Sequence, residues 1–316
     1  MRSIVAHRIS TQHSFLSAVC AVALACLALP FPFRAQQQQQ QDEDIVRVNT
    51  DLIVLNVSVL NAQGEYVHNL RRTDFELRED GRAQTISNFS VEETPFAAAI
   101  LLDTSGSMET RVSLARAAAI SFLDGLRTDD VAAVYKFDSK IEQLQDYSSS
   151  RDLAPLAFGL RAKGLTVLND AILRAAIDIS ARDEKRRAIV VLSDGADTHS
   201  NASRNKALER ALAAGATIYA VDMAETVNPA ARPLDGGSNA LREFALKSGG
   251  RYIATPGGRA MREAFTQIVE ELGNQYTLGY QSTNRTRDGR WRTLEVTLAR
   301  PGTTVRTRKG YRAPKS

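Results

Sequence analysis

Cysteine and histidine, the usual nucleophiles and soft metal ligands, are scarce in this 316-residue sequence. There are two cysteines, Cys20 and Cys26, and four histidines. Both cysteines lie in an apolar N-terminal stretch, so a chain cleaved after this stretch would contain no cysteine. Such a chain would form no disulfide and would offer no thiolate to a metal ion.

Motifs of the common hydrolases are also missing. The sequence has no Gly-x-Ser-x-Gly nucleophile elbow and no Gly-x-x-x-x-Gly-Lys-Ser/Thr phosphate-binding loop. Outside the N-terminal stretch the only histidines are His68 and His199. We therefore expect that the protein is not an enzyme. A metal ion held by carboxylates could still activate water, so a metal-dependent hydrolase is a minor alternative.

The first 35 residues have the pattern of a secretory signal. Arg2 and Arg8 precede an apolar run over residues 15–33, and prolines interrupt the end of this run. Cleavage is expected after Ala35, with Ala28 as the alternative. The prediction is a secreted, periplasmic or cell-envelope protein. The run is close to the roughly 20 residues that span a bilayer, so an uncleaved membrane anchor is the alternative and would be the only membrane contact.

Charge is distributed unevenly along the sequence. The formal net charge is +4, yet the segment from Asn274 onward contains 10 basic and 2 acidic residues. These basic residues alternate with threonine, leucine and valine, which is typical of the solvated face of paired strands. A polyanion site is the alternative interpretation, but we expect no nucleic-acid partner.

A glutamine-rich linker over residues 36–44 leads into a first all-β part, residues 45–94. Alternation of apolar and polar residues predicts strands over Leu52–Leu60, Phe75–Glu79 and Thr85–Val91. The segments NAQGE and EDGR contain the glycine and Asx residues of hairpin turns.

Residues 95–273 alternate between strand and helix patterns. An apolar strand over Phe96–Leu102 is followed by a helical pattern over Thr110–Leu126, and RDLAPLAFGLRAKG is among the later predicted helices. Such alternation predicts an α/β domain with crossover units on a mostly parallel sheet. Central strands such as AIVVL are continuously apolar because both faces of the sheet are covered.

Residues 274–313 return to strand patterns. The segments QYTLGYQS, RWRTLEVTLA and TTVRTRKGY each predict a strand, with turn signals RDG and RPG between them. The economical interpretation is one small β-sandwich made of residues 45–94 and 274–313, with the α/β domain inserted. Two independent β pieces that flank the α/β domain are the alternative.

Oxygen-bearing side chains follow strands or enter helices at three places in the α/β domain. They are Asp103, Ser105 and Ser107 in DTSGSM, Thr166 in KGLT, and Asp194 in LSDG. Ligands of open α/β sheets bind at the carboxyl ends of the strands, so we expect these side chains to converge. Carboxylate and hydroxyl oxygens are hard ligands that suit Mg²⁺, Mn²⁺ or Ca²⁺. The sequence therefore predicts a divalent cation site at this edge.

The segments DTSGSM, GLT and LSDG resemble the metal-ion-dependent adhesion site of von Willebrand factor A-type domains. The pattern Asp-x-Ser-x-Ser, then a distant Thr and a distant Asp, is matched at all five positions. The resemblance covers about residues 95–273 and implies a Rossmann-like, doubly wound sheet with one antiparallel edge strand. It also implies that the two serines contact the metal, and that the threonine and the aspartates bind it directly or through water. The flanking β segments resemble those of an exported A-domain family common in acidobacteria.

The resemblance favours a binding module over a catalyst. We expect Mg²⁺, or else Mn²⁺ or Ca²⁺, to bind an Asp or Glu of a protein partner, as in adhesion or in contacts within the cell envelope. An envelope scaffold in which the metal is structural is the alternative. Other acids fall near the expected strand ends, namely Asp138, Asp170, Asp197 and Asp222. We interpret Asp170 as a charge at a helix N-terminus, and Asp197 and His199 as residues beside the site.

Overall fold

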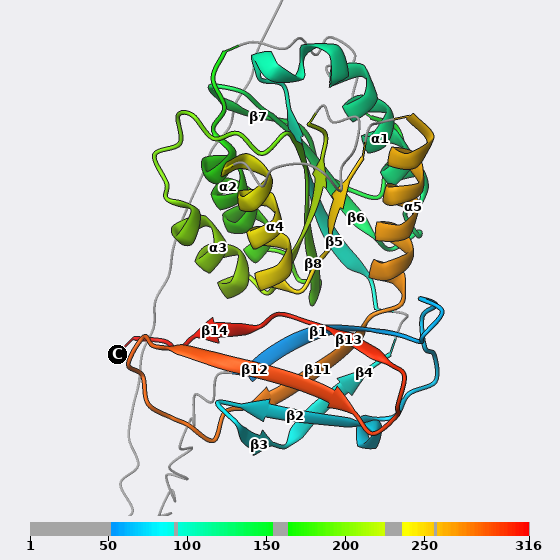
Figure 1. Ribbon diagram of the computed structural model, residues 1–316, viewed down its shortest axis with the longest axis vertical. Helices are drawn as coiled ribbons and strands as arrows, with labels where there is room; N and C mark the ends of the chain where they lie inside the picture. The colour runs from blue at the N-terminus through cyan, green and yellow to red at the C-terminus, as the bar shows by residue number, and fades with distance from the viewer. Residues whose placement is uncertain (1–51, 92–93, 154–163, 225–235, 256–257, 316) are drawn as a thin grey trace, which may run out of the picture. The chain divides into compact units, whose positions relative to one another are not determined.

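The computed structural model describes residues 52–91, 94–153, 164–224, 236–255 and 258–315. These residues form two regions of different architecture (Figure 1). We call residues 96–273 the α/β region, and residues 52–90 together with 276–312 the β region. The predicted signal segment and linker lie outside the described residues, as does most of the helix predicted for RDLAPLAFGLRAKG.

A six-stranded sheet forms the centre of the α/β region, in the order β10-β9-β8-β5-β6-β7. Its strands are β5 (Phe96–Asp103), β6 (Val131–Phe137), β7 (Ile141–Ser148), β8 (Arg186–Ser193), β9 (Ala216–Asp222) and β10 (Tyr252–Ala254). Neighbouring strands pair parallel, except that β7 pairs antiparallel with β6 at one edge. All eight residues of β5 are buried, as expected of a strand covered on both faces. The predicted α/β fold class is confirmed.

Helices cover both faces of this sheet (Figure 1). They are α1 (Val112–Asp124), α2 (Leu168–Ser180), α3 (Arg204–Ala213), α4 (Gly236–Ser248) and α5 (Gly258–Gly273). Because side chains alternate along a strand, β5 contributes to two hydrophobic clusters. Ile100 packs in a cluster with Phe122 of α1 and Phe265 of α5. Leu101 belongs to the other cluster, which contains residues of α2, α3 and α4 such as Ile172.

Two four-stranded antiparallel sheets make up the β region, in the orders β13-β1-β11-β4 and β14-β12-β2-β3. The strands are β1 (Leu52–Leu60), β2 (Phe75–Glu79), β3 (Arg82–Gln84), β4 (Ile86–Ser90), β11 (Tyr276–Gln281), β12 (Trp291–Leu298), β13 (Thr304–Arg306) and β14 (Gly310–Arg312). Each sheet pairs strands that precede the α/β region in the sequence with strands that follow it. In β1 and β11, Leu55 lies opposite Leu278, and in β2 and β12, Leu77 lies opposite Val296. All four side chains lie in one hydrophobic cluster. The domain boundaries given above remain predictions.

Turn residues and apolar–polar alternation in the sequence predict some of these strands correctly and others incorrectly. The turn between β2 and β3 has Asp80 and Gly81 at φ 48° and 78°, the left-handed pair of a type I′ hairpin. By contrast, TTVRTRKGY was predicted as one strand and forms two, since β13 pairs with β1 and β14 with β12. Alternation along the sequence does not reveal a strand that changes sheets. Among the described residues, no helix is long and apolar enough to cross a bilayer.

Buried charged side chains join the end of α5 to the β region. Glu271 is fully buried, and its Oε1 accepts a hydrogen bond of 2.9 Å from the Ser58 hydroxyl of β1. Its Oε2 lies 2.5 Å from Nη2 of Arg306 on β13. The fully buried Arg186 of β8 donates to the carbonyl of Leu272, one residue further on. The last turn of α5 is therefore held from both regions.

Loss of the Glu271 carboxylate should destabilise the protein strongly. Glu271→Ala leaves the Arg306 guanidinium without its buried counter-ion, and breaking one side of a buried pair costs about 3–5 kcal/mol. The matched control is Glu270→Ala, the exposed neighbour on the same helix, with an expected change of less than about 0.5 kcal/mol. Urea unfolding of the two variants measures the difference. Equal unfolding free energies would contradict the role assigned to Glu271.

Candidate functional site

A buried hydrogen bond connects the carboxyl ends of the two central strands. Asp103, the last residue of β5, is fully buried, and its Oδ2 accepts a hydrogen bond of 2.5 Å from the hydroxyl of Ser193. Ser193 is likewise fully buried and ends β8. The other carboxylate oxygen accepts the backbone N–H of Ser105 at 2.8 Å. The Asp103 carboxylate is thus fixed between the two strands.

The chain turns tightly after Asp103. The hydroxyls of Ser105 and Ser107 lie 3.2 Å apart, so both point toward one location. Ser105 is buried and Ser107 is exposed, which places the pair at the edge of the buried sheet. A 3₁₀ helix (Gly106–Arg111) follows and α1 starts only at Val112, two residues later than predicted. The site turn therefore takes up residues that the sequence pattern favours as helix.

The loop that contains Thr166 lies against this turn. The N–H of Gly106 donates to the carbonyl of Gly164 at 3.3 Å. Thr166 is buried, and its N–H donates to the Thr198 hydroxyl at 3.0 Å. The carbonyl of Thr166 accepts the N–H groups of Thr198 and His199, both at 3.0 Å. Backbone hydrogen bonds thus tie the loop before α2 to the turn after β5 and to the loop after β8.

Asp194 is positioned by the residues on either side of it. Its Oδ1 accepts the N–H of Ala196 at 3.1 Å, and the N–H of Gly195 donates to the Ser193 hydroxyl at 2.9 Å. Gly195 has φ +84°, and a Cβ there would lie 2.3 Å from the carbonyl oxygen of Gly237. Only glycine fits this close approach. The chain therefore leaves β8 in a fixed turn with Asp194 half-buried at its start.

Burial dominates the electrostatics of Asp103. Desolvation raises its pKa from 3.8 to about 6, although hydrogen bonds from Ser105 and Ser193 act in the opposite direction. The negative charge of Asp194 raises the pKa further. A nearby cation would favour the ionised form of both carboxyl groups. The arrangement of the charges therefore favours a positive ligand.

The donor chemistry of the five predicted residues fits a hard divalent cation. Two carboxylates and three hydroxyls offer oxygen alone, which suits Mg²⁺, Mn²⁺ or Ca²⁺. In the described part of the chain, the candidate site included, no group of three or more His, Cys, Asp and Glu could hold a metal ion, so the predicted site depends on its hydroxyl oxygens as well as on its two carboxylates. The structure brings the three segments of the site to one edge of the sheet. The metal-ligand roles of Asp103, Ser105, Ser107, Thr166 and Asp194 remain predictions.

The other acids near this edge make structural hydrogen bonds. Asp170 accepts the N–H groups of Asn201 and Ala202, both at 2.8 Å, so it holds the loop before α3 as well as lying in the first turn of α2. Asp197 accepts the N–H of Asn169 at 2.8 Å, and His199 is exposed beside it. The Oδ1 of Asp138 accepts the N–H of Lys140.

Two further buried residues, Ser193 and Asp222, make side-chain hydrogen bonds that hold this edge together. Ser193, which the sequence analysis missed, is the direct partner of Asp103. The only signal for it was a hydroxyl residue at the strand end in LSDG. The buried Asp222 of β9 accepts hydrogen bonds from the hydroxyls of Ser238 at 2.7 Å and Tyr252 at 2.6 Å. It thus anchors α4 and β10 at the same edge.

Residues 98–196 match the family model of the von Willebrand factor type A domain. The matched range contains all five predicted site residues. This part of the α/β region therefore matches a von Willebrand factor A-type domain, and the β region lies outside the match. The comparison with curated proteins found no match to the chain.

Several solved structures are similar to the chain at low identity. An aerotolerance-related membrane protein from Bacteroides fragilis is 19% identical, with a TM-score of 0.46 over 56% of this chain and 98% of that one. A von Willebrand factor type A protein from Catenulispora acidiphila is 12% identical, with a TM-score of 0.47 over 85% and 75%. The pilus adhesin SpaC from Lactobacillus rhamnosus GG is 10% identical, with a TM-score of 0.47 over 82% and 48%. Similarity at this level does not bear on function.

Neutralising Asp103 should stabilise the metal-free protein at neutral pH. Because the folded-state pKa lies above 3.8, the carboxyl group contributes stability below about pH 4 that is lost as the pH rises through about 6. Asp103→Asn carries no buried charge. Between pH 4 and pH 7, its free energy of unfolding should rise relative to that of the wild type by up to about 3 kcal/mol.

Urea unfolding of dialysed, metal-free protein across this pH range measures the gain. Asp129→Asn, at an exposed turn, is the control and should show no such trend. A constant difference between Asp103→Asn and wild type at every pH would contradict the prediction.

Proposed function

We propose that this protein is an exported binding module. In this proposal, a divalent cation at the carboxyl ends of β5 and β8 binds an Asp or Glu side chain of a protein partner. The observation that carries the proposal is the buried Asp103 carboxylate, which sits beside the paired hydroxyls of Ser105 and Ser107. The N-terminal sequence supports export to the periplasm, the envelope or the exterior. Adhesion or an interaction within the envelope are the roles that we infer.

Each residue would have a distinct part in holding the cation. Asp103 would supply a charge that is already fixed by Ser193 and by the backbone. Ser105 and Ser107 would supply neutral oxygens, and Thr166 and Asp194 would complete the protein's share of the ligands. A cation bound largely by neutral hydroxyls keeps most of its charge, and the exposed side of Ser107 leaves room for an incoming carboxylate. Bound in this way, the cation supplies attraction for an anionic group.

A binding role agrees with the chemistry of the residues at this edge. Histidine is represented there by the exposed His199, and cysteine is absent from the sequence after residue 26. Asp170 and Asp197 accept backbone N–H groups and thereby hold loops. We therefore propose no catalytic residue. A scaffold in which the cation only stabilises the fold is the second candidate, because the buried charge of Asp103 would by itself favour a structural cation.

Mg²⁺ should stabilise the protein, and the stabilisation should depend on the site carboxylates. At a Mg²⁺ concentration one hundred times the dissociation constant, mass action gives about 2.7 kcal/mol. We expect Asp103→Asn and Asp194→Asn to abolish this effect. Asp138→Asn, an acid at the same edge outside the predicted ligand set, should retain it. Thermal melts with Mg²⁺, Mn²⁺ and Ca²⁺ against EDTA test this, and equal melts for all variants would contradict a cation site.

Partner binding should require both the cation and an acidic group. Cross-linked pull-down from envelope extract is expected to yield a partner in Mg²⁺ and none in EDTA. Ser107→Ala should reduce capture without loss of fold, since this side chain is exposed. Replacing the partner's contact acid by the corresponding amide should abolish binding. The scaffold candidate predicts instead that Mg²⁺ raises the melting temperature while the captured partner is the same in EDTA.

A further inference from the structure

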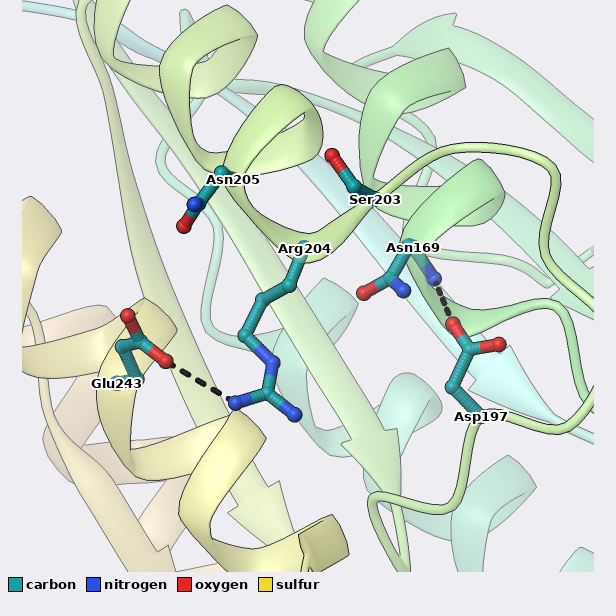
Figure 2. Close-up of a pocket in the computed structure, with 6 residues that line it drawn as sticks. All are labelled: Asn169, Asp197, Ser203, Arg204, Asn205 and Glu243. Carbon is teal, nitrogen blue, oxygen red and sulfur yellow. Dashed lines mark hydrogen bonds and ion pairs between the residues drawn. The ribbon is translucent and has the colours of Figure 1, made fainter.

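A polar pocket of about 450 Å³ opens between the start of α2, the start of α3 and the side of α4 (Figure 2). Its lining residues are Asn169, Asp197, Ser203, Arg204, Asn205 and Glu243. None of these six belongs to the predicted cation ligands. The pocket is large enough for a side chain together with the main chain that carries it.

This pocket adjoins the candidate cation site. Asn169 follows Thr166 by three residues, and Asp197 follows Asp194 by three residues. The N–H of Asn169 donates to Asp197 Oδ2 at 2.8 Å, so the two walls are joined (Figure 2). Three residues of chain span at most about 10 Å. A partner segment that places an acid on the cation can therefore reach the pocket within about three extended residues.

The charges around the pocket balance. Nη1 of Arg204 lies 3.1 Å from Glu243 Oε2, and Lys247 lies 2.6 Å from the other carboxylate oxygen. Hydrogen bonds from Lys247 and then Arg204 lower the pKa of Glu243, so this residue is ionised and already paired. The exposed Asp197 offsets the remaining positive charge. A neutral polar ligand suits these surroundings better than a charged one.

A hydrogen-bond donor and an acceptor face each other across the pocket. The carboxamide oxygen of Asn169 is buried and has no hydrogen-bond partner among the described residues. A buried acceptor without a donor is unfavourable by about 1–3 kcal/mol. Figure 2 shows this oxygen on the side of Asn169 that faces Arg204, whose second terminal nitrogen points away from Glu243. The last torsion of Asn is soft, so the oxygen can turn to a donor that enters the pocket.

We propose that this pocket binds a carboxamide, the side chain of Asn or Gln, near the metal-bound acid of the partner. The carbonyl of the ligand accepts from Arg204, and its NH₂ donates to Asn169 Oδ1 and to Asp197. A carboxamide presents a donor and an acceptor side by side on one planar group without net charge. The assignment to the partner rests on the proposed function, whereas the chemistry of the pocket does not.

The pocket can be tested without metal. The probe is N-acetylglutamine N-methylamide, added to isotope-labelled protein in EDTA and followed through the Arg204 Nε–H and Asn169 NH₂ resonances. The hydrogen bonds of its carboxamide should favour it about tenfold over the equally long methionine analogue. The lysine and glutamate analogues should bind no better than methionine. A preference for either charged probe, or no shift of these resonances, overturns the proposal.

Variants distinguish specific binding of the glutamine probe in the pocket from a general effect of removing a positive charge. Arg204→Ala and Asn169→Ala should each abolish the preference for glutamine over methionine. Neither should impair folding, because the Arg204–Glu243 pair is partly exposed and such pairs contribute about 0–1 kcal/mol. The control is Lys206→Ala, which removes a positive charge from the exposed side of the same helix and should keep the preference. Retention of the preference in Arg204→Ala overturns the proposal.

A random peptide library selected on the Mg²⁺-loaded protein distinguishes the two proposals. Peptides eluted by EDTA should carry Asp or Glu with Asn or Gln within three residues. Acidic peptides without this bias would leave the proposed function standing and overturn the role of the pocket. If no peptide depends on Mg²⁺ while the glutamine probe binds in EDTA, the proposed function fails and the pocket remains a carboxamide site.

Discussion

The hydrogen bond between Ser193 and Asp103 is the constraint on which the edge of the central sheet depends. It joins the last residues of β5 and β8, which lie side by side in parallel register up to Leu102 and Leu192. A carboxylate in this position has no access to water, and its pKa rises accordingly. The neighbouring groups that lower this penalty are a hydroxyl and a backbone N–H. Under the proposed function, a cation at the turn of Ser105 and Ser107 would supply the counter-charge that this buried acid lacks.

The loops at this edge hold one another through carboxylate-to-backbone hydrogen bonds. Asp170 reaches from α2 to the loop before α3, and Asp197 reaches back from the loop after β8 to the start of α2. Each bond satisfies N–H groups at a helix start or in a loop, which otherwise lack partners. Asp197 also lines the polar pocket, so one of these loop contacts is shared with it.

Sequence reasoning succeeded where the signal was local and failed where the partner was distant. The α/β class followed from the alternation of patterns, and the Asp80–Gly81 hairpin followed from turn chemistry. Nothing adjacent to Ser193 indicates that its hydroxyl meets a carboxylate 90 positions earlier. The pairing of Glu271 with Arg306 was equally hidden, because no local pattern links the end of α5 to a strand further along the sequence. The split of TTVRTRKGY into two strands likewise depends on β1 and β12, far away in sequence.

Several basic residues of the C-terminal segment form contacts with the α/β region, which the sequence pattern did not indicate. Arg306 pairs with Glu271, and Arg312 lies 2.5 Å from Glu209 on α3. Arg308 donates to the carbonyl of Leu212 at the end of the same helix, and burial lowers the pKa of its guanidinium to about 10. The side chains of these three basic residues thus contact the α/β region directly. The uneven charge along the sequence therefore reflects, at least in these three residues, complementarity between two parts of one chain. Such contacts join the β region to α5 and α3 of the α/β region through charged side chains.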